Sequence, residues 1–188
     1  PAAEIAIGME EDVVHALEAA RCGELLRRGE VHLLLYLEAV IGGAMDILIE
    51  RLSETQSLRQ TVRSALLERG WIRTRKGESA KSASKYENYF QYQEPVASLS
   101  RPENSHRYLA MKRGWMEGEL ILTLGGKPVP DGEPDPFENQ LIQAFEAAAC
   151  TVPDSPAAEV LRKAARLAYK AHVFPSLENE IHKTLKDS

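Results

Sequence analysis

Side chains capable of acid–base, nucleophilic or metal chemistry are few and widely spaced in this chain. The five histidines show no H-E-x-x-H pattern, and the two cysteines have no C-x-x-C partner. These residues are His15, His32, His106, His172, His182, Cys22 and Cys150. No G-x-S-x-G element occurs, and the run Gly125-Gly126-Lys127 lacks the spacing of a phosphate-binding loop. We therefore expect no catalytic residue, no metal site and no cofactor, and we interpret both cysteines as reduced thiols of a cytoplasmic protein.

Charge patterning, in contrast, offers a candidate binding surface. Residues 1–50 carry −7 (3 basic and 10 acidic side chains), residues 51–118 carry +6 (13 and 7), and residues 119–188 carry −4 (7 and 11), which sum to −5. A basic middle attracts phosphate locally even when the whole chain repels it. The alternative is that the acidic flanks neutralise the middle in the fold. The sequence leaves both readings open.

The candidate nucleic-acid-binding residues are cations of this middle. They are Arg73, Arg75, Lys76, Lys81, Lys85, Arg107, Lys112 and Arg113. Tyr86, Tyr89, Phe90 and Tyr92 lie among them. Exposed rings stack on unpaired bases, whereas buried rings would anchor the loop to the core. We favour anchoring, because four exposed rings would be a solubility liability.

A second basic cluster lies on one side of an expected helix near the C-terminus. It consists of Arg162, Lys163, Arg166 and Lys170. The opposite side carries Val160, Ala164 and Leu167, so we interpret the cations as a solvated face.

Helical periodicity dominates the elements that must position these residues. We expect a helix over 10–28, a second over 31–53 interrupted at Gly42-Gly43, and a third from the cap Thr55 to Gly70. Ser105 is expected to cap a helix that Gly114 stops. Further helices are expected after Asp135, after Ser155-Pro156 and, beyond a break at Pro175, after Ser176.

Two short alternating segments are expected to be strands. Residues 71–75 and 119–124 fit an antiparallel ribbon, and 76–103 is expected to be a long loop with one helical turn near 86–92. The fold class is therefore mainly α: a helical bundle-like scaffold with one short two-stranded antiparallel β ribbon. We divide it into segments 1–53, 54–125 and 126–188, the last beginning in a turn-rich linker.

Five sequence elements, in order, resemble motifs of the Tex family of transcription accessory proteins. Residues 85–95 resemble K-Y-x-x-Y-F-x-x-x-E-P, residues 105–114 resemble S-H-R-x-L-A-x-x-R-G, and residues 117–120 resemble E-G-x-L. Residues 43–48 resemble G-A-x-D-I-L, and residues 175–181 resemble P-x-L-E-x-E-(I/L). The first forty residues match poorly, and the loop before Ser105 is longer than the family's.

The resemblance implies a non-catalytic helical segment from the N-terminal region of a larger protein. In that family a ribonuclease-H-like domain, a helix-hairpin-helix module and an RNA-binding OB-fold follow this region, and RNA binding is attributed mainly to the OB-fold. The initial Pro1 also fits a fragment.

Our main hypothesis is a scaffold segment that contacts RNA or DNA weakly. The rival is a protein–protein module that docks on RNA polymerase or on the missing domains. No apolar run is long enough to cross a membrane and no leader is evident, so we expect no membrane partner. The oligomeric state is not specified by the sequence.

Overall fold

The computed structural model describes residues 31–80, 83–128 and 135–187, with side chains from residue 41 onward. The expected helix over 10–28, the side chains of His15, Cys22 and His32, and Lys81 lie outside these residues. Two compact units are present: a first unit of residues 1–61 and 142–174, and a second of residues 62–141 and 175–188. The division into 1–53, 54–125 and 126–188 stays a prediction.

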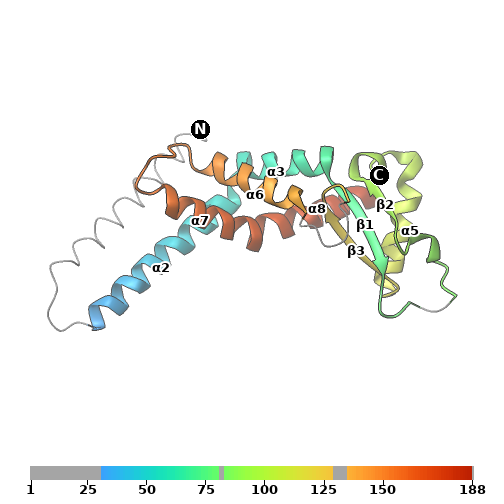
Figure 1. Ribbon diagram of the computed structural model, residues 1–188, viewed down its shortest axis with the longest axis horizontal. Coiled ribbons are helices and arrows are strands. Elements are labelled where there is room, and N and C mark those ends of the chain that lie inside the picture. The colour runs from blue at the N-terminus through green and yellow to red at the C-terminus, as the bar shows by residue number, and fades with distance from the viewer. Residues whose placement is uncertain (1–30, 81–82, 129–134, 188) are drawn as a thin grey trace. The chain divides into compact units, whose positions relative to one another are not determined.

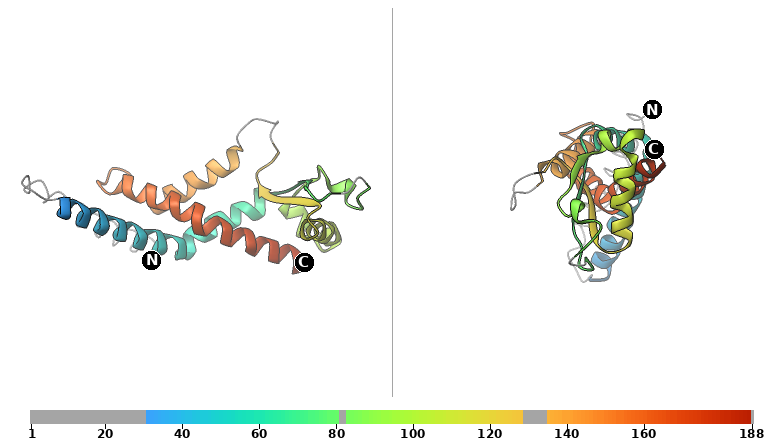
Figure 2. Two further views of the ribbon diagram at one scale, coloured as in Figure 1. Left: turned by 90° about the horizontal axis from the view of Figure 1, so that it is seen from below. Right: turned by 90° about the vertical axis from the view of Figure 1, so that its right-hand side faces the viewer.

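The described part of the first unit, residues 31–61 and 142–174, is helical. Its longest helix, α2 (Val31–Glu54), packs against α7 (Ala158–Ala168), as Figure 2 shows. The interface is filled by small and branched side chains, because alanines let helix backbones approach while leucines fill the space between them. Leu48 and Leu52 of α2 are buried, as are Leu161, Ala164 and Ala168 of α7.

Two sequence interpretations of these helices are wrong. Gly42 and Gly43 do not interrupt α2, which runs through them, and no described atom would lie within 4 Å of a Cβ added at either. The buried side of α7 is centred on Leu161, Ala164 and Ala168, and Leu167 is 43% exposed. The second error arose because alanines occupy much of the buried face and carry a weak periodic signal.

The expected break at Pro175 is also wrong. A π-helical turn, Tyr169–Val173, joins α7 directly to α8 (Phe174–Asp187). The Phe174 N–H donates to the Tyr169 carbonyl, five residues back. Proline lacks an N–H, so Pro175 fits the first turn of α8, where the widened turn before it accommodates the ring.

The second unit contains a three-stranded antiparallel sheet rather than a two-stranded ribbon (Figure 1). The central strand β1 (Trp71–Lys76) pairs with β3 (Leu120–Gly125), as expected, and also with the short β2 (Gln93–Pro95). The mainly α prediction is confirmed. β2 was missed because three residues ending in proline give no alternating pattern.

Short elements fill the expected loop. They are the 3₁₀ turn η2 (Glu87–Tyr89), the helix α4 (Val96–Leu99) and the 3₁₀ turn η3 (Pro102–Asn104). α5 (Ser105–Met116) follows and packs against β3. Gly114 lies inside α5 instead of stopping it, and the chain leaves the helix at Gly118, whose φ of 74° suits glycine.

α3 (Gln56–Arg69), α6 (Pro136–Ala149) and α8 each contribute residues to both units. α6 begins as predicted: Asp135 accepts a hydrogen bond from the Phe137 N–H at 2.9 Å. Phe137, Leu141 and Phe145 are buried along it. Within the described chain, every helix is too short or too polar to cross a lipid bilayer.

Candidate nucleic-acid interface

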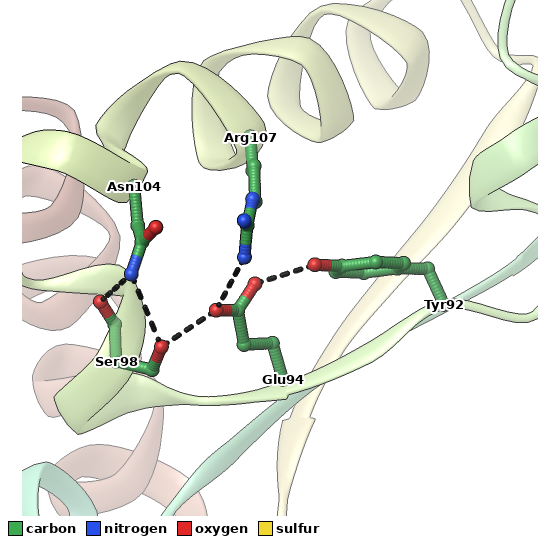
Figure 3. Close-up of polar contacts among 5 residues, drawn as sticks. All are labelled: Tyr92, Glu94, Ser98, Asn104 and Arg107. Carbon is green, nitrogen blue, oxygen red and sulfur yellow. Dashed lines mark hydrogen bonds and ion pairs between the residues drawn. The ribbon is translucent and has the colours of Figure 1, made fainter.

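A buried carboxylate organises the first of two contact networks in the second unit. Glu94 in β2, only 7% exposed, accepts hydrogen bonds from the hydroxyls of Tyr92 and Ser98, both at 2.6 Å. Arg107 of α5 donates to the same carboxylate at 3.1 Å, and Asn104 donates to the Ser98 carbonyl at 3.1 Å (Figure 3). The network ties β2, α4 and the start of α5 together.

Electrostatics explain why this carboxylate tolerates burial. Burial alone would raise the pKa of Glu94, but the hydrogen bonds from Ser98 and Tyr92 and the Arg107 guanidinium outweigh it, and the pKa is lowered. The charge of Glu94 in turn raises the pKa of Arg107. Arg107, a predicted phosphate contact, is therefore held by an internal carboxylate.

The second network joins the start of the tyrosine-rich segment to the end of α5. Lys85 forms an ion pair with Glu117 at 3.0 Å, and its ammonium group lies 5.0 Å from the centre of the Tyr86 ring. A Cβ added to Gly114 would lie 2.7 Å from Leu120 and 3.1 Å from Tyr86. Glycine is therefore required for the close approach of α5 to this ring.

The aromatic residues mainly anchor the loop, in line with the interpretation favoured from the sequence. Tyr86 is 4% exposed, and Tyr92 is engaged by Glu94 and packs edge-on against Tyr89 at 5.2 Å. The Thr74 hydroxyl donates to the Tyr89 carbonyl, which fixes the turn against β1. The Lys76 ammonium group lies 5.4 Å from the centre of the Phe90 ring.

Arg73 is also engaged inside the unit. It forms an ion pair with Asp135 at 2.9 Å, and the same carboxylate group accepts the N–H of Gly126 at 3.0 Å. Asp135 comes from the acidic C-terminal flank, as does Glu180, which pairs with Arg63 at 2.7 Å. Part of the basic middle is thus neutralised by a flank, as the alternative reading of the charge pattern proposed.

The remaining described candidates lie towards one end of the second unit. Arg75 and Lys76 end β1, next to Ile121 and Leu120 at the start of β3. α5 ends only four residues before β3 begins, which brings its last turns, with Lys112 and Arg113, to the same end. Within the described residues, none of these four cations forms an ion pair with a carboxylate.

Sequence reasoning missed an aromatic stack in this unit. Trp115 of α5, 44% exposed, stacks on the ring of His182 in α8 with centroids 6.0 Å apart, and His182 stacks on the buried Tyr108 at 6.1 Å. The Tyr108 hydroxyl contacts His182 Nδ1 at 2.9 Å. Burial and the nearby Lys112 lower the pKa of His182 to about 4, so the ring is neutral at pH 7. The spacing of Tyr108 and Trp115, two turns apart, was the available signal.

In the first unit, two of the four cations of the C-terminal basic cluster contact other residues. Arg166 pairs with Glu146 at 2.7 Å, and Arg162 donates to the Pro153 carbonyl at 3.2 Å. Lys163 and Lys170 are exposed. Among the described residues no group of three His, Cys, Asp or Glu side chains is arranged to hold a metal ion.

These contacts define a mainly helical module in which the tyrosine-rich and S-H-R elements hold a small sheet to its neighbouring helices. The chain belongs to the Tex central region-like family, whose model matches residues 35–188. The family prediction is confirmed, whereas the expected N-terminal region is corrected: the matching model is that of the family's central region.

Relatives from several bacteria agree with this assignment. The chain is 32% identical over 152 residues to the uncharacterized protein YdcI of Bacillus subtilis, and 31% identical over 154 residues to the transcriptional accessory protein Tex of Neisseria gonorrhoeae. It is 26% identical over 155 residues to the protein tex of Bordetella pertussis. Each match covers 80% of this chain but 19% of the relative, so the chain spans about a fifth of their length.

Proposed function

We propose that this chain is a non-catalytic scaffold segment of a transcription accessory protein in the cytoplasm, and that its second unit contacts RNA or DNA weakly. The observation that carries this proposal is a group of cations that form no ion pair with a carboxylate within the described residues: Arg75, Lys76, Lys112 and Arg113. Counterion release drives such contacts, so we expect them to be sensitive to salt. The gonococcal relative's name supports the transcriptional setting.

The internal networks support a scaffold role. Arg73, Lys85 and Arg107 are held by Asp135, Glu117 and Glu94, so contact with phosphate would require these arginines and the lysine to leave existing partners. We therefore assign Arg73, Lys85 and Arg107 to holding the fold, and Arg75, Lys76, Lys112 and Arg113 to the nucleic acid.

Fluorescence anisotropy of the 188-residue chain with labelled single-stranded RNA tests the proposal. Binding at low salt should weaken as salt rises, with a log–log slope of about −3 if all four cations contact phosphates. Arg75→Ala should reduce the slope by about 0.7, whereas Lys163→Ala, an exposed lysine of the first unit, should leave it unchanged. Absence of binding at micromolar protein would reject the intrinsic contact.

A protein–protein docking module is the second candidate. It is favoured by the large apolar side chains exposed in the first unit: Ile41 at 42%, Ile47 at 53% and Leu167 at 43%. RNA polymerase or the rest of the parent protein would be the partner. Capture of polymerase that is undiminished by nuclease treatment, and lost on Ile47→Asp, would favour this candidate over nucleic-acid contact.

A further inference from the structure

Trp115 is an unusual surface residue, because a large ring is left substantially open to solvent near the end of α5. It is 44% exposed, and its neighbour Met116 is 78% exposed. An exposed tryptophan without support would be mobile, and ordering it on a partner would cost conformational entropy. This ring, however, is stacked on a second ring from another helix.

The rings behind Trp115 are buried and hydrogen-bonded. His182 is 7% exposed and stacks on Trp115 with an interplanar angle of 30°. The Tyr108 hydroxyl lies 2.9 Å from His182 Nδ1 and donates towards the His182 carbonyl at 3.1 Å, and Tyr108 itself is fully buried. Three rings from α5 and α8 thus form a continuous stack, with Trp115 at its solvent-exposed end.

Two lysines lie one turn of helix from rings of this stack. Lys112 lies one turn before Trp115 on α5, with its ammonium group 6.0 Å from the centre of the Tyr108 ring. Lys186 lies one turn after His182 on α8, on the same side of that helix. In the described part of the chain, neither lysine forms an ion pair with a carboxylate. Glu178, whose oxygen is 4.0 Å from His182 Nε2, is the nearest acid shown.

We propose that Trp115 is a stacking platform for one unpaired base of a single-stranded nucleic acid, with Lys112 and Lys186 contacting the flanking phosphates. This inference rests on the proposed nucleic-acid contact and adds the class of nucleic acid and the residue that selects it. A stacked indole ring binds any base through its π face, and lysines near the stack favour a phosphate-bearing strand over an apolar protein surface.

The test uses the 188-residue chain carrying Trp71→Phe, so that Trp115 is the single remaining tryptophan of the two. A single-stranded RNA of about 12 nucleotides should quench its fluorescence on binding. An oligomer with the same sugar–phosphate backbone but no bases should bind more weakly and quench little. Trp115→Ala should weaken RNA binding about ten-fold, and Trp115→Phe should retain most of the affinity of the unmodified ring.

Met116→Ala is the matched control, since it removes a more exposed apolar side chain at the same helix end and should leave affinity unchanged. Circular dichroism should show the same helical content in all variants. The same oligonucleotides made of DNA should bind comparably, because stacking does not read the sugar.

The failures are distinguishable. RNA binding without quenching, or with equal affinity after Trp115→Ala, would overturn the platform and leave the proposed cation contacts standing. An equal loss of binding to the base-free oligomer would also overturn it, because Trp115 would then act only through the fold. Absence of any RNA binding by the unmodified chain would overturn the proposed function itself, and capture of a protein through Trp115 in that case would favour the docking module.

Discussion

At the scale of single residues, removal of the Glu94 side chain should destabilise the fold through the polar contacts that it organises. Glu94→Ala would leave the hydroxyls of Tyr92 and Ser98 without their acceptor in a buried site. We expect the free energy of unfolding to fall by about 2 kcal/mol, measured by urea denaturation. Glu103→Ala removes an exposed carboxylate nearby and should change stability by less than about 0.5 kcal/mol. Equal stability of both variants would show that the network does not hold the unit.

His182 gives the fold a pH dependence. Its pKa is lowered in the fold from 6.5 to about 4, by burial and by Lys112, so the unfolded chain binds more protons between these values. The contribution of His182 to the free energy of unfolding should therefore be fully present above pH 6.5. The free energy of unfolding should fall by up to roughly 3 kcal/mol as pH is lowered to about 4. Burial raises the pKa of the adjacent Glu178, which opposes the trend near the lower limit.

Urea denaturation at several pH values measures this dependence. His182→Asn places an amide oxygen near the position of Nδ1 and removes the titrating ring. Between pH 6.5 and 4, the free energy of unfolding of this variant should change less with pH than that of the unmodified chain. Parallel curves for both proteins would mean that other groups cause the loss at low pH.

At the scale of the elements, glycines in two helices should respond oppositely to the same substitution. Gly42→Ala in α2 should raise the free energy of unfolding by about 0.5–1 kcal/mol, because alanine favours helix and no described atom lies within 4 Å of the new Cβ. Gly114→Ala in α5 should lower it by about 1–3 kcal/mol, because its Cβ would lie 2.7 and 2.9 Å from Leu120. Thermal denaturation of both variants checks the pair; a gain at Gly114 would mean that Leu120 moves aside without cost.

The sequence predicted elements with a strong periodic signal and missed those set by tertiary contacts. The bounds of α3 and the start of α6 were predicted from Thr55, Gly70 and Asp135. The Thr55 hydroxyl, however, donates to the Arg51 carbonyl of the preceding helix. β2 and the π turn before Pro175 were missed because pairing with β1 and continuous packing of two helices, not local propensity, determine them.

The candidate site shows the same difference between features with a local sequence signal and features set by tertiary contacts. Basic residues were recognisable from composition, but the partners of Arg73 and Arg107 lie 62 and 13 residues away, and no local pattern shows which cations are neutralised. Trp115 was not predicted as a site residue, because its role depends on His182, which belongs to a helix far away in the sequence.

At the scale of the whole molecule, the net charge of −5 opposes binding of a polyanion. Asp46, Glu50 and Glu54 are exposed on α2, which belongs to the first unit. Replacing them by Asn, Gln and Gln removes three negative charges and changes −5 to −2. We expect affinity for single-stranded RNA to rise a few-fold at about 0.01 M salt, where the Debye length is about 30 Å, and to be unchanged at about 0.15 M, where it is about 8 Å. Anisotropy titrations at both salt concentrations measure the effect, and an equal gain at both would mean that these carboxylates lie against the bound strand and that α2 takes part in the contact.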